Sequence, residues 1–150
     1  MLLSKSCEYG LRAALFLASV DEEGYISIRE ISDKLDISFH FLTKILQQLK
    51  AEELVASFKG PNGGVQLAKP GQSIKLLDII EAIDGDDLFN ECVLGLPGCG
   101  DRKPCAMHNK WTDHRKGIKE MLEITTLKEL AEESKSENFR INVSQSFNDL

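Results

Sequence analysis

The sequence lacks several features that would place it in a familiar class. No apolar run among its 150 residues reaches the about 18 residues that a membrane-spanning helix needs. Residues 1–6 lack the arrangement of a secretory signal, in which a basic region is followed by an apolar segment and a small-residue cleavage site. Phosphate-binding glycine motifs, a nucleophile elbow and paired catalytic carboxylates are missing as well. We therefore expect a cytoplasmic protein that neither enters a membrane nor acts as an enzyme on a small-molecule substrate.

The chain has only four cysteines, and its acidic side chains outnumber the basic ones. In a reducing compartment the four cysteines do not indicate a disulfide framework, so ligation or redox chemistry gains weight. The 18 basic and 24 acidic side chains give a net charge of −6, which argues against a protein that coats nucleic acid in bulk. Residues 38–75, however, carry five lysines against two glutamates. A basic patch on an acidic protein is typical of site-directed DNA binding.

Two short helices joined by a tight turn are predicted after a buried helix that includes residues 11–18. Ser27 and Glu30 have the spacing of a capping box, and Ser38 is a suitable N-cap for the second helix. Apolar residues recur at helical spacing on the inner face of that second helix: Leu42, Ile45, Leu46 and Leu49. This pattern predicts a helix-turn-helix.

A β-hairpin is predicted directly afterwards. The β-prone segments 54–58 and 65–68 flank a loop rich in glycine, with one proline, at residues 59–64. A further core helix follows and ends near Gly85. The expected fold is mainly α with a small β-hairpin wing, a winged helix-turn-helix over residues 1–84.

The recognition helix and the wing carry candidate DNA contacts. His40 and Lys44 lie four residues apart on one helix face with Thr43 beside them, and such side chains donate to base edges and phosphates. On the wing, Lys59 precedes Gly60 and Pro61 and can enter a minor groove. The alternatives are an ordinary solvated helix face and a plain hairpin turn.

The cysteines of residues 85–105 form the sharpest signal. Cys92, Cys99 and Cys105 follow a C-x6-C-x5-C spacing in a loop rich in glycine and proline, and His108 comes three residues later. Thiolates in such a loop can ligate an iron–sulfur cluster or zinc, and spacing wider than the C-x2-C pairs of zinc sites favours the cluster. Three unrelated thiols and a thiol–disulfide switch remain alternatives. Cys7 stands apart and is expected in the core.

The last third of the chain predicts a dimerisation element over residues 106–133. A helix from about residue 106 to 124 precedes a short helix that opens with the capping box Thr126–Glu129. One stripe of the longer helix carries the residues expected to pair with a second copy: Met107, Trp111, Ile118 and Leu122. A homodimer would read a palindromic site on double-stranded DNA. Residues 134–150 are polar and aperiodic, which predicts a disordered tail.

Taken together, residues 1–130 resemble bacterial winged-helix regulators of the IscR, NsrR and RirA type. The resemblance rests on segments 8–13, 31–38, 42–49 and 59–68, on the three-cysteine loop, and on residues 105–111. It implies a homodimeric transcription factor whose iron–sulfur cluster changes its DNA affinity or specificity with iron status, redox state or nitric oxide. It places the following residues in the major groove, with Lys59 in the minor groove: Ser38, His40, Phe41, Thr43 and Lys44.

The resemblance leaves the cluster type open. A histidine three residues after the third cysteine, here His108, is similar to the arrangement in IscR and favours 2Fe–2S over 4Fe–4S. An acidic residue early in the first helix, here Glu8, is similar to NsrR and is a rival fourth ligand. The first cysteine gap is one residue longer than usual, and Lys59 stands where wings of this type often carry arginine. An iron–sulfur carrier without sequence-specific DNA affinity is a further alternative.

Overall fold

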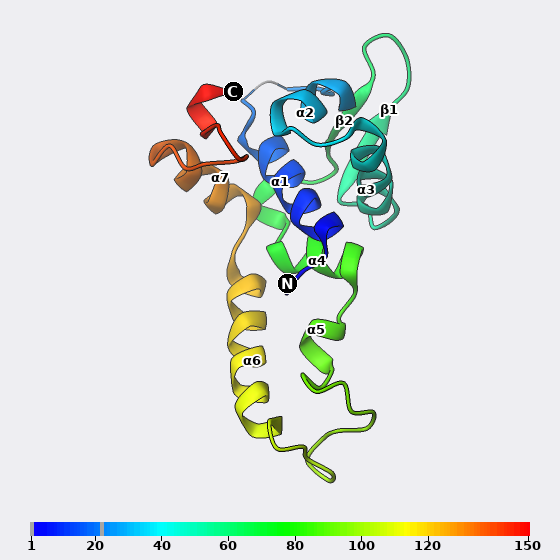
Figure 1. The fold of residues 1–150 in the computed structure, drawn as a ribbon. Coiled ribbons are helices and arrows are strands. Elements are labelled where there is room, and N and C mark those ends of the chain that lie inside the picture. The colour runs from blue at the N-terminus through cyan, green and yellow to red at the C-terminus, as the bar shows by residue number, and fades with distance from the viewer. Residues whose placement is uncertain (1, 22) are drawn as a thin grey trace.

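The N-terminal half of the chain is helical, and its first helices begin at serines. In this computed structural model, which describes residues 2–21 and 23–150, α1 spans Lys5–Ser19, α2 spans Ile28–Leu35 and α3 spans Phe39–Ala51 (Figure 1). The hydroxyl oxygens of Ser4 and Ser27 accept hydrogen bonds from backbone N–H groups in the first turns of α1 and α2. Ser38 occupies the N-cap of α3 without a capping bond from its side chain. Its predicted capping bond is thus absent.

The predicted wing is present as an antiparallel pair, β1 (Val55–Phe58) and β2 (Gly64–Leu67). Ile26, just before α2, exchanges two backbone hydrogen bonds with Val65 and so ties the wing to the helix-turn-helix. Gly64 makes this contact possible, because a Cβ there would lie 2.0 Å from the Ile26 carbonyl oxygen. The helices and hairpin confirm the winged helix-turn-helix.

One core holds this half together and also includes parts of the C-terminal segment. The 3-10 turn η1 (Gly71–Ser73) leads to α4 (Leu76–Asp84), which ends at Gly85 with a positive φ of 76° as predicted. Apolar side chains from α1, α2, α3 and the hairpin pack together, and the fully buried ones include Ala13, Ile31, Leu35, Leu42 and Leu49. Leu127, from the far end of the chain, is also fully buried in this cluster.

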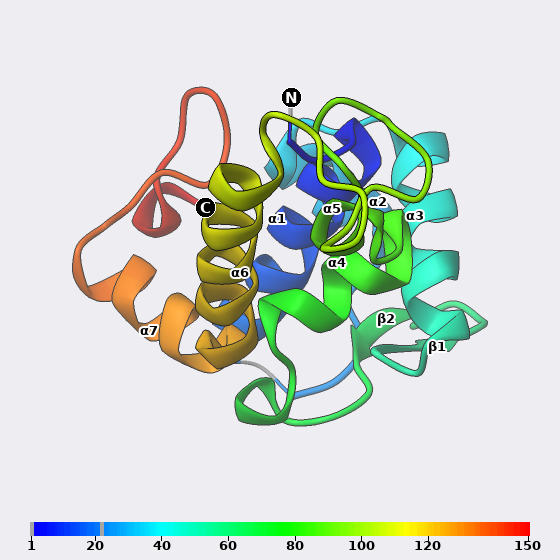
Figure 2. The ribbon, with the colours of Figure 1, turned by 90° about the horizontal axis from the view of Figure 1, so that it is seen from below.

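The rest of the chain leaves this core and returns to it. The short α5 (Asp87–Asn90) leads into the cysteine loop, and α6 (His108–Ile124) runs back beside α5 and α4 (Figures 1 and 2). Where α6 meets α7 (Leu127–Ser136), the N–H of Leu76 donates to the carbonyl of Thr125 (3.0 Å) and that of Leu127 to Ile74 (2.9 Å). These bonds fix the end of α6 to the segment just after the wing.

A second apolar cluster joins α1, α4, α5 and α6, and it includes part of the stripe predicted for the dimer contact. Cys7 is fully buried there, as predicted, with Leu77, Ile80 and Phe89. Leu122 is only 8% exposed in the same cluster, and Ile118 packs against it. Leu122, which was expected to meet a second copy, thus packs within its own chain because α6 folds back onto α4. Ile118 stays partly exposed, so its place in a dimer contact remains a prediction.

The prediction of a disordered tail over residues 134–150 is wrong. Helix α7 continues to Ser136, and the following residues form a turn that ends in η2 (Phe147–Asp149). Ile141 and Phe147 are buried in the main core. The side-chain amide of the buried Asn142 donates to the carbonyl of Lys34 in α2 (2.8 Å). The sequence did not predict this docking, because the few buried side chains of the segment follow neither a helical nor a strand periodicity.

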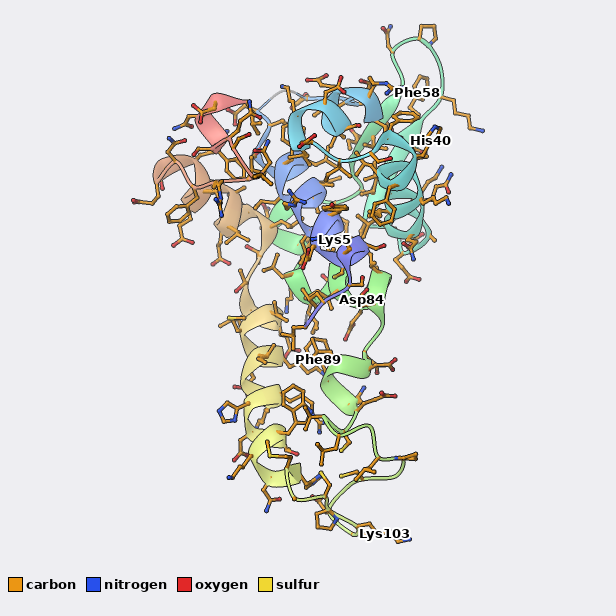
Figure 3. All side chains as sticks on the ribbon, in the orientation of Figure 1. Lys5, His40, Phe58, Asp84, Phe89 and Lys103 are labelled. Atoms are coloured by element: carbon orange, nitrogen blue, oxygen red, sulfur yellow. The ribbon has the colours of Figure 1, made fainter. Side chains whose placement is uncertain are left out.

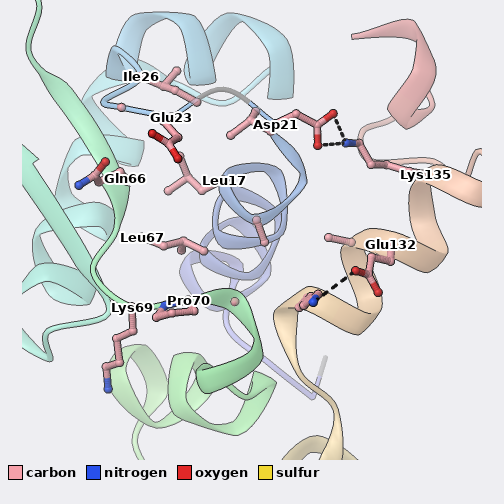
Figure 4. A pocket seen from close by; sticks show the side chains of 16 residues that line it. Leu17, Asp21, Glu23, Ile26, Gln66, Leu67, Lys69, Pro70, Glu132 and Lys135 are labelled. Carbon is pink, nitrogen blue, oxygen red and sulfur yellow. Dashed lines mark hydrogen bonds and ion pairs between the residues drawn. The ribbon is translucent and has the colours of Figure 1, made fainter.

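Helix α7 packs on α1 beside an open hollow of about 790 Å³ that β2 borders on the other side (Figure 4). At its mouth the ammonium of Lys135 contacts both carboxylate oxygens of Asp21 at 2.9 Å. Thr126 and Glu129 form the predicted capping box of α7. No described helix is long and apolar enough to cross a membrane.

We predict that Phe147→Ala lowers the free energy of unfolding by about 3–5 kcal/mol, because it leaves a cavity in the main core. Urea unfolding followed by circular dichroism measures the change. Val143→Ala is the matched control, since Val143 lies in the same segment at 82% exposure. Equal stability of the two variants would show that the tail does not dock in solution.

Candidate metal centre and DNA-binding surface

The three cysteines of the loop converge at the end of the molecule that carries Lys103 in Figure 3. Successive tight turns fold the loop: the N–H of Gly95 donates to the carbonyl of Cys92, and that of Cys99 donates to Leu96. Gly95 and Gly98 adopt positive φ angles of 67° and 69°, which glycine tolerates without strain. The loop is therefore shaped by its glycines to bring its two ends together.

The thiols form a compact donor set. The Sγ atoms of Cys92, Cys99 and Cys105 all lie within 4.8 Å of one another, and those of Cys92 and Cys105 are 3.5 Å apart. The backbone N–H of Cys105 donates to the Cys99 sulfur at 3.4 Å. All three residues are half-buried. Three soft ligands at this separation suit an iron–sulfur cluster or a thiophilic ion.

His108 faces the same site from the first turn of α6. Its Nδ1 lies 3.5 Å from the Cys99 sulfur, and its side chain is only 12% exposed. Its Nε2 lies 3.2 Å from a carboxylate oxygen of Asp101. A carboxylate on one ring nitrogen holds the proton there and leaves the other nitrogen free to act as a ligand.

The thiols differ in acidity. Backbone N–H groups, that of Leu96 above all, lower the pKa of the Cys92 thiol to about 7. The backbone N–H of Cys105 lowers the pKa of the Cys99 thiol, but burial and the neighbouring thiols outweigh it, so the pKa of Cys99 is raised. Burial raises the pKa of the Cys7 thiol to about 12, which fits its place in the core. The lowered pKa favours the reactive thiolate form at Cys92, whereas the raised pKa disfavours it at Cys7.

Glu8, the rival fourth ligand, is not among the groups around the thiols of its own chain. It lies on α1 and pairs with Lys5 at 2.8 Å. Figure 3 shows Lys5 in the helical body and Lys103 at the far tip of the loop. Glu8 could therefore reach a cluster only from a second copy of the chain.

The base of the loop is fastened to α6. The indole N–H of Trp111 donates to the carbonyl of Glu91 at 3.0 Å, and the guanidinium of Arg115 donates to the same oxygen at 2.8 Å. Trp111, expected at the dimer interface, thus binds within its own chain. Met107 is 38% exposed just before α6. These two bonds join the base of the loop to the first turns of α6.

The predicted DNA-contacting residues lie at the opposite end of the molecule, where Figure 3 labels His40 and Phe58. Ser38, His40 and Lys44 are exposed at the N-terminal part of α3. On the wing, Lys59, Gly60 and Pro61 are exposed at the tip between the strands. The surface that presents donors to DNA and the thiol site are therefore separate.

Two predicted recognition residues are partly engaged within the chain. Phe41 meets Tyr9 of α1 edge to face, with ring centroids 5.5 Å apart. The hydroxyl of Thr43 donates to the carbonyl of Phe39 at 2.7 Å. Both side chains are half-buried, so they present less surface to a partner than His40 or Lys44.

Sequence reasoning missed Asp101, Arg115 and the carbonyl of Glu91. An acidic residue between two cysteine ligands was a usable signal, because metal-bound histidines commonly pair with a carboxylate. Arg115 and Glu91 offered none, since a contact between a side chain and a backbone carbonyl 24 residues away leaves no local pattern.

Comparison with known proteins agrees with this arrangement. Residues 3–133 match the family Rrf2, described as "Iron-dependent Transcriptional regulator". The chain is 32% identical over 130 residues to the HTH-type transcriptional regulator IscR of Erwinia tasmaniensis, covering 87% of this chain and 78% of that one.

Solved structures give the same assignment. The chain is similar to CymR (YrzC), the global cysteine regulator of B. subtilis, with a TM-score of 0.72 and 30% identity over 87% of this chain and 95% of that one. It is also similar to IscR of T. potens, with a TM-score of 0.71 and 26% identity over 92% of each chain. The earlier resemblance is thus confirmed, and proteins of this kind bind DNA and are not enzymes. The chain belongs to the Rrf2 family of winged-helix transcriptional regulators.

Proposed function

We propose that this chain is a DNA-binding regulator whose three loop cysteines and His108 hold an iron–sulfur cluster that controls its DNA affinity or specificity. The observation that carries the proposal is the convergence of the three Sγ atoms within 4.8 Å, beside the Nδ1 of a histidine. The names of the family and of its relative IscR support a role in iron-dependent regulation.

The residues present fit such a cluster. Three thiols and one imidazole supply the four protein ligands that a small cluster takes. The pairing of His108 with Asp101 supports a nitrogen ligand, and a mixed sulfur and nitrogen set favours 2Fe–2S over 4Fe–4S. When bound, the cluster supplies a centre that is sensitive to oxidants, nitric oxide and iron supply. Glu8 from a second copy is the competing fourth ligand.

The chain's own contacts offer a route from the loop to the DNA-binding surface. Trp111 and Arg115 join the loop to the start of α6. At the other end of α6, Thr125 is bonded to Leu76, shortly after the wing. If the loop became disordered when the cluster is lost, the bonds of Trp111 and Arg115 to Glu91 would break. The backbone bonds near Thr125 would remain, so α6 would tilt about that end. The orientation of the DNA-binding half would change with it.

The dimer part of this proposal uses the outer face of α6. Leu122 is buried within the chain, but Ile124 is 75% exposed, Met121 is 55% exposed, and Ile118 borders the same open surface as Met121. These apolar side chains, together with Met107, are available to a second copy on the helix that leads from the thiol site. A homodimer built on α6 would place two recognition helices on a palindromic operator.

Thiol–disulfide switching is a second candidate, and a specific contact favours it. The sulfurs of Cys92 and Cys105 are 3.5 Å apart, so a small movement would allow a bond between them. Hydrogen peroxide would oxidise the Cys92 thiolate to a sulfenic acid, and the Cys105 thiol would then displace water to form the disulfide. Two thiols lose two electrons and two protons, and the peroxide is reduced to two water molecules.

We predict that protein purified without oxygen absorbs visible light near about 320–460 nm and contains iron and sulfide. Cys92→Ala, Cys99→Ala and Cys105→Ala should each lose this absorption, because each removes a thiolate ligand. Cys7→Ala should keep it, since Cys7 lies in the core. The test is to record the absorption spectrum of each variant and to measure its iron, zinc and sulfide content.

Within the same series, His108→Ala should alter the spectrum, and His114→Ala is its matched control. His114 lies on the same helix, is exposed, and its Nδ1 contacts the carbonyl of Lys110 at 2.8 Å. A spectrum unchanged by His108→Ala would favour Glu8 as the fourth ligand. A colourless protein with zinc, or without metal, would reject the cluster.

We predict for the metal-free protein that hydrogen peroxide links Cys92 to Cys105 and leaves Cys7 reduced. The rate should fall about tenfold for each pH unit below the Cys92 pKa of about 7, because only the thiolate attacks peroxide. Peptide mapping by mass spectrometry locates the bond. Equal oxidation of all four cysteines would contradict a specific disulfide switch between Cys92 and Cys105.

We predict that Ile124→Asp shifts the protein from dimer to monomer, because it buries a charge in the proposed interface. Sedimentation equilibrium gives the molecular mass. Val143→Asp is the control, since it adds the same charge at a residue that is 82% exposed outside α6. A dimer that withstands Ile124→Asp would place the interface elsewhere.

A further inference from the structure

A groove of about 430 Å³ lies between the recognition helix, the start of α2 and the wing. Its floor is apolar and includes Leu46, Val55 and Val65. Its rim carries Arg29, Lys50 and Lys59. The groove opens next to the exposed end of α3, so a duplex held by α3 and the wing would pass across it.

The charge of this groove differs from that of the whole chain. Among its described lining residues there are three cations and no carboxylate, on a protein with a net charge of −6. In the part of the chain that the structure describes, none of the three cations forms an ion pair. Their charge is therefore available to an anion from outside.

Arg29 is held in position by an aromatic ring. Its guanidinium lies 4.3 Å from the ring centroid of Phe39, the first residue of α3. Stacking of this kind restrains the planar group and leaves its N–H donors free at the edges. A guanidinium with fixed donors matches the oxygens of a phosphate.

Lys50 crosses the groove from the other side. Its ammonium donates a hydrogen bond of 2.6 Å from α3 to the hydroxyl of Ser57 on β1. This contact places a positive charge between the helix and the wing. It uses one of the three ammonium donors and leaves two for a ligand.

We infer that this groove binds a phosphodiester of the DNA backbone, with Arg29 and Lys50 as its principal donors. The inference rests on the DNA-binding function of the family and adds two residues to the surface predicted from sequence. Contacts to phosphates fix the position of a protein on the duplex and carry no base information. Arg29 and Lys50 thus set how α3 is seated, and the exposed end of α3 reads the bases.

The test uses the full-length protein and two fluorescent duplexes. One is selected by the wild-type protein from a random-sequence pool, and the other has the same composition in scrambled order. Fluorescence anisotropy at several KCl concentrations gives the association constant for each duplex, and from these values the slope of its logarithm against the logarithm of the salt concentration. Arg29→Gln and Lys50→Gln should each reduce that slope by about 0.9 per bound protomer and weaken both duplexes by the same factor. Arg29→Lys should restore most of the slope.

Two controls separate charge from structure. Lys128→Gln removes an exposed lysine on α7, away from the groove, and should leave the slope unchanged. Ser57→Ala removes the hydrogen bond to Lys50 but keeps the charge, so it should also keep the slope. An unchanged slope in Arg29→Gln and Lys50→Gln would overturn the inference, and so would a loss confined to the selected duplex. Binding by the wild type reports on the DNA-binding function itself, so the two failures are distinguishable.

Discussion

The structure depends on the point where the chain rejoins its core after the cysteine loop. Two backbone hydrogen bonds pair residues 74–76 with residues 125–127. Without them α6 would be held by the Phe89–Leu122 cluster and by its contacts with the loop. With them, one end of α6 is bonded to the segment that leads into α4, and the other end begins three residues after Cys105, beside the thiol site. A helix of 17 residues that is bonded at both ends links the loop to this segment, and its internal hydrogen bonds resist bending.

This arrangement explains how two chemically unrelated surfaces can coexist in a chain of 150 residues. The side chains predicted to contact DNA are donors and cations on α3 and the wing, which the core supports from behind. The thiol site is rich in glycine and is built on a loop whose described residues contribute no side chain to the main core. The predicted DNA-binding surface is therefore built on a rigid helix, whereas the thiol site is built on an adaptable loop at the other end of the molecule.

The sequence predicted the parts whose signals are local. Ser27 marked the start of α2, the loop between the β-prone segments marked the wing, and Cys92, Cys99 and Cys105 marked the thiol site. It failed where the partner is distant in sequence. The stripe of Ile118 and Leu122 indicates an apolar partner but cannot say whether that partner is α4 or a second chain. The burial of Ile141 and Phe147 depends on core side chains that are distant in sequence. Asp101 likewise meets His108, and Arg29 meets Phe39, only in the folded chain.

The shared core also determines where related regulators can be recombined. Leu127, Ile141 and Phe147 complete the packing of the winged helix, so a crossover near residue 84 would separate side chains that belong to one core. The segment between Glu91 and Met107 is different, because it is exposed and joined to the body mainly at its base. Chimeras that exchange this segment between relatives would transplant ligand chemistry while the DNA-reading half stays intact. The modular unit of the protein is therefore a loop and not a domain.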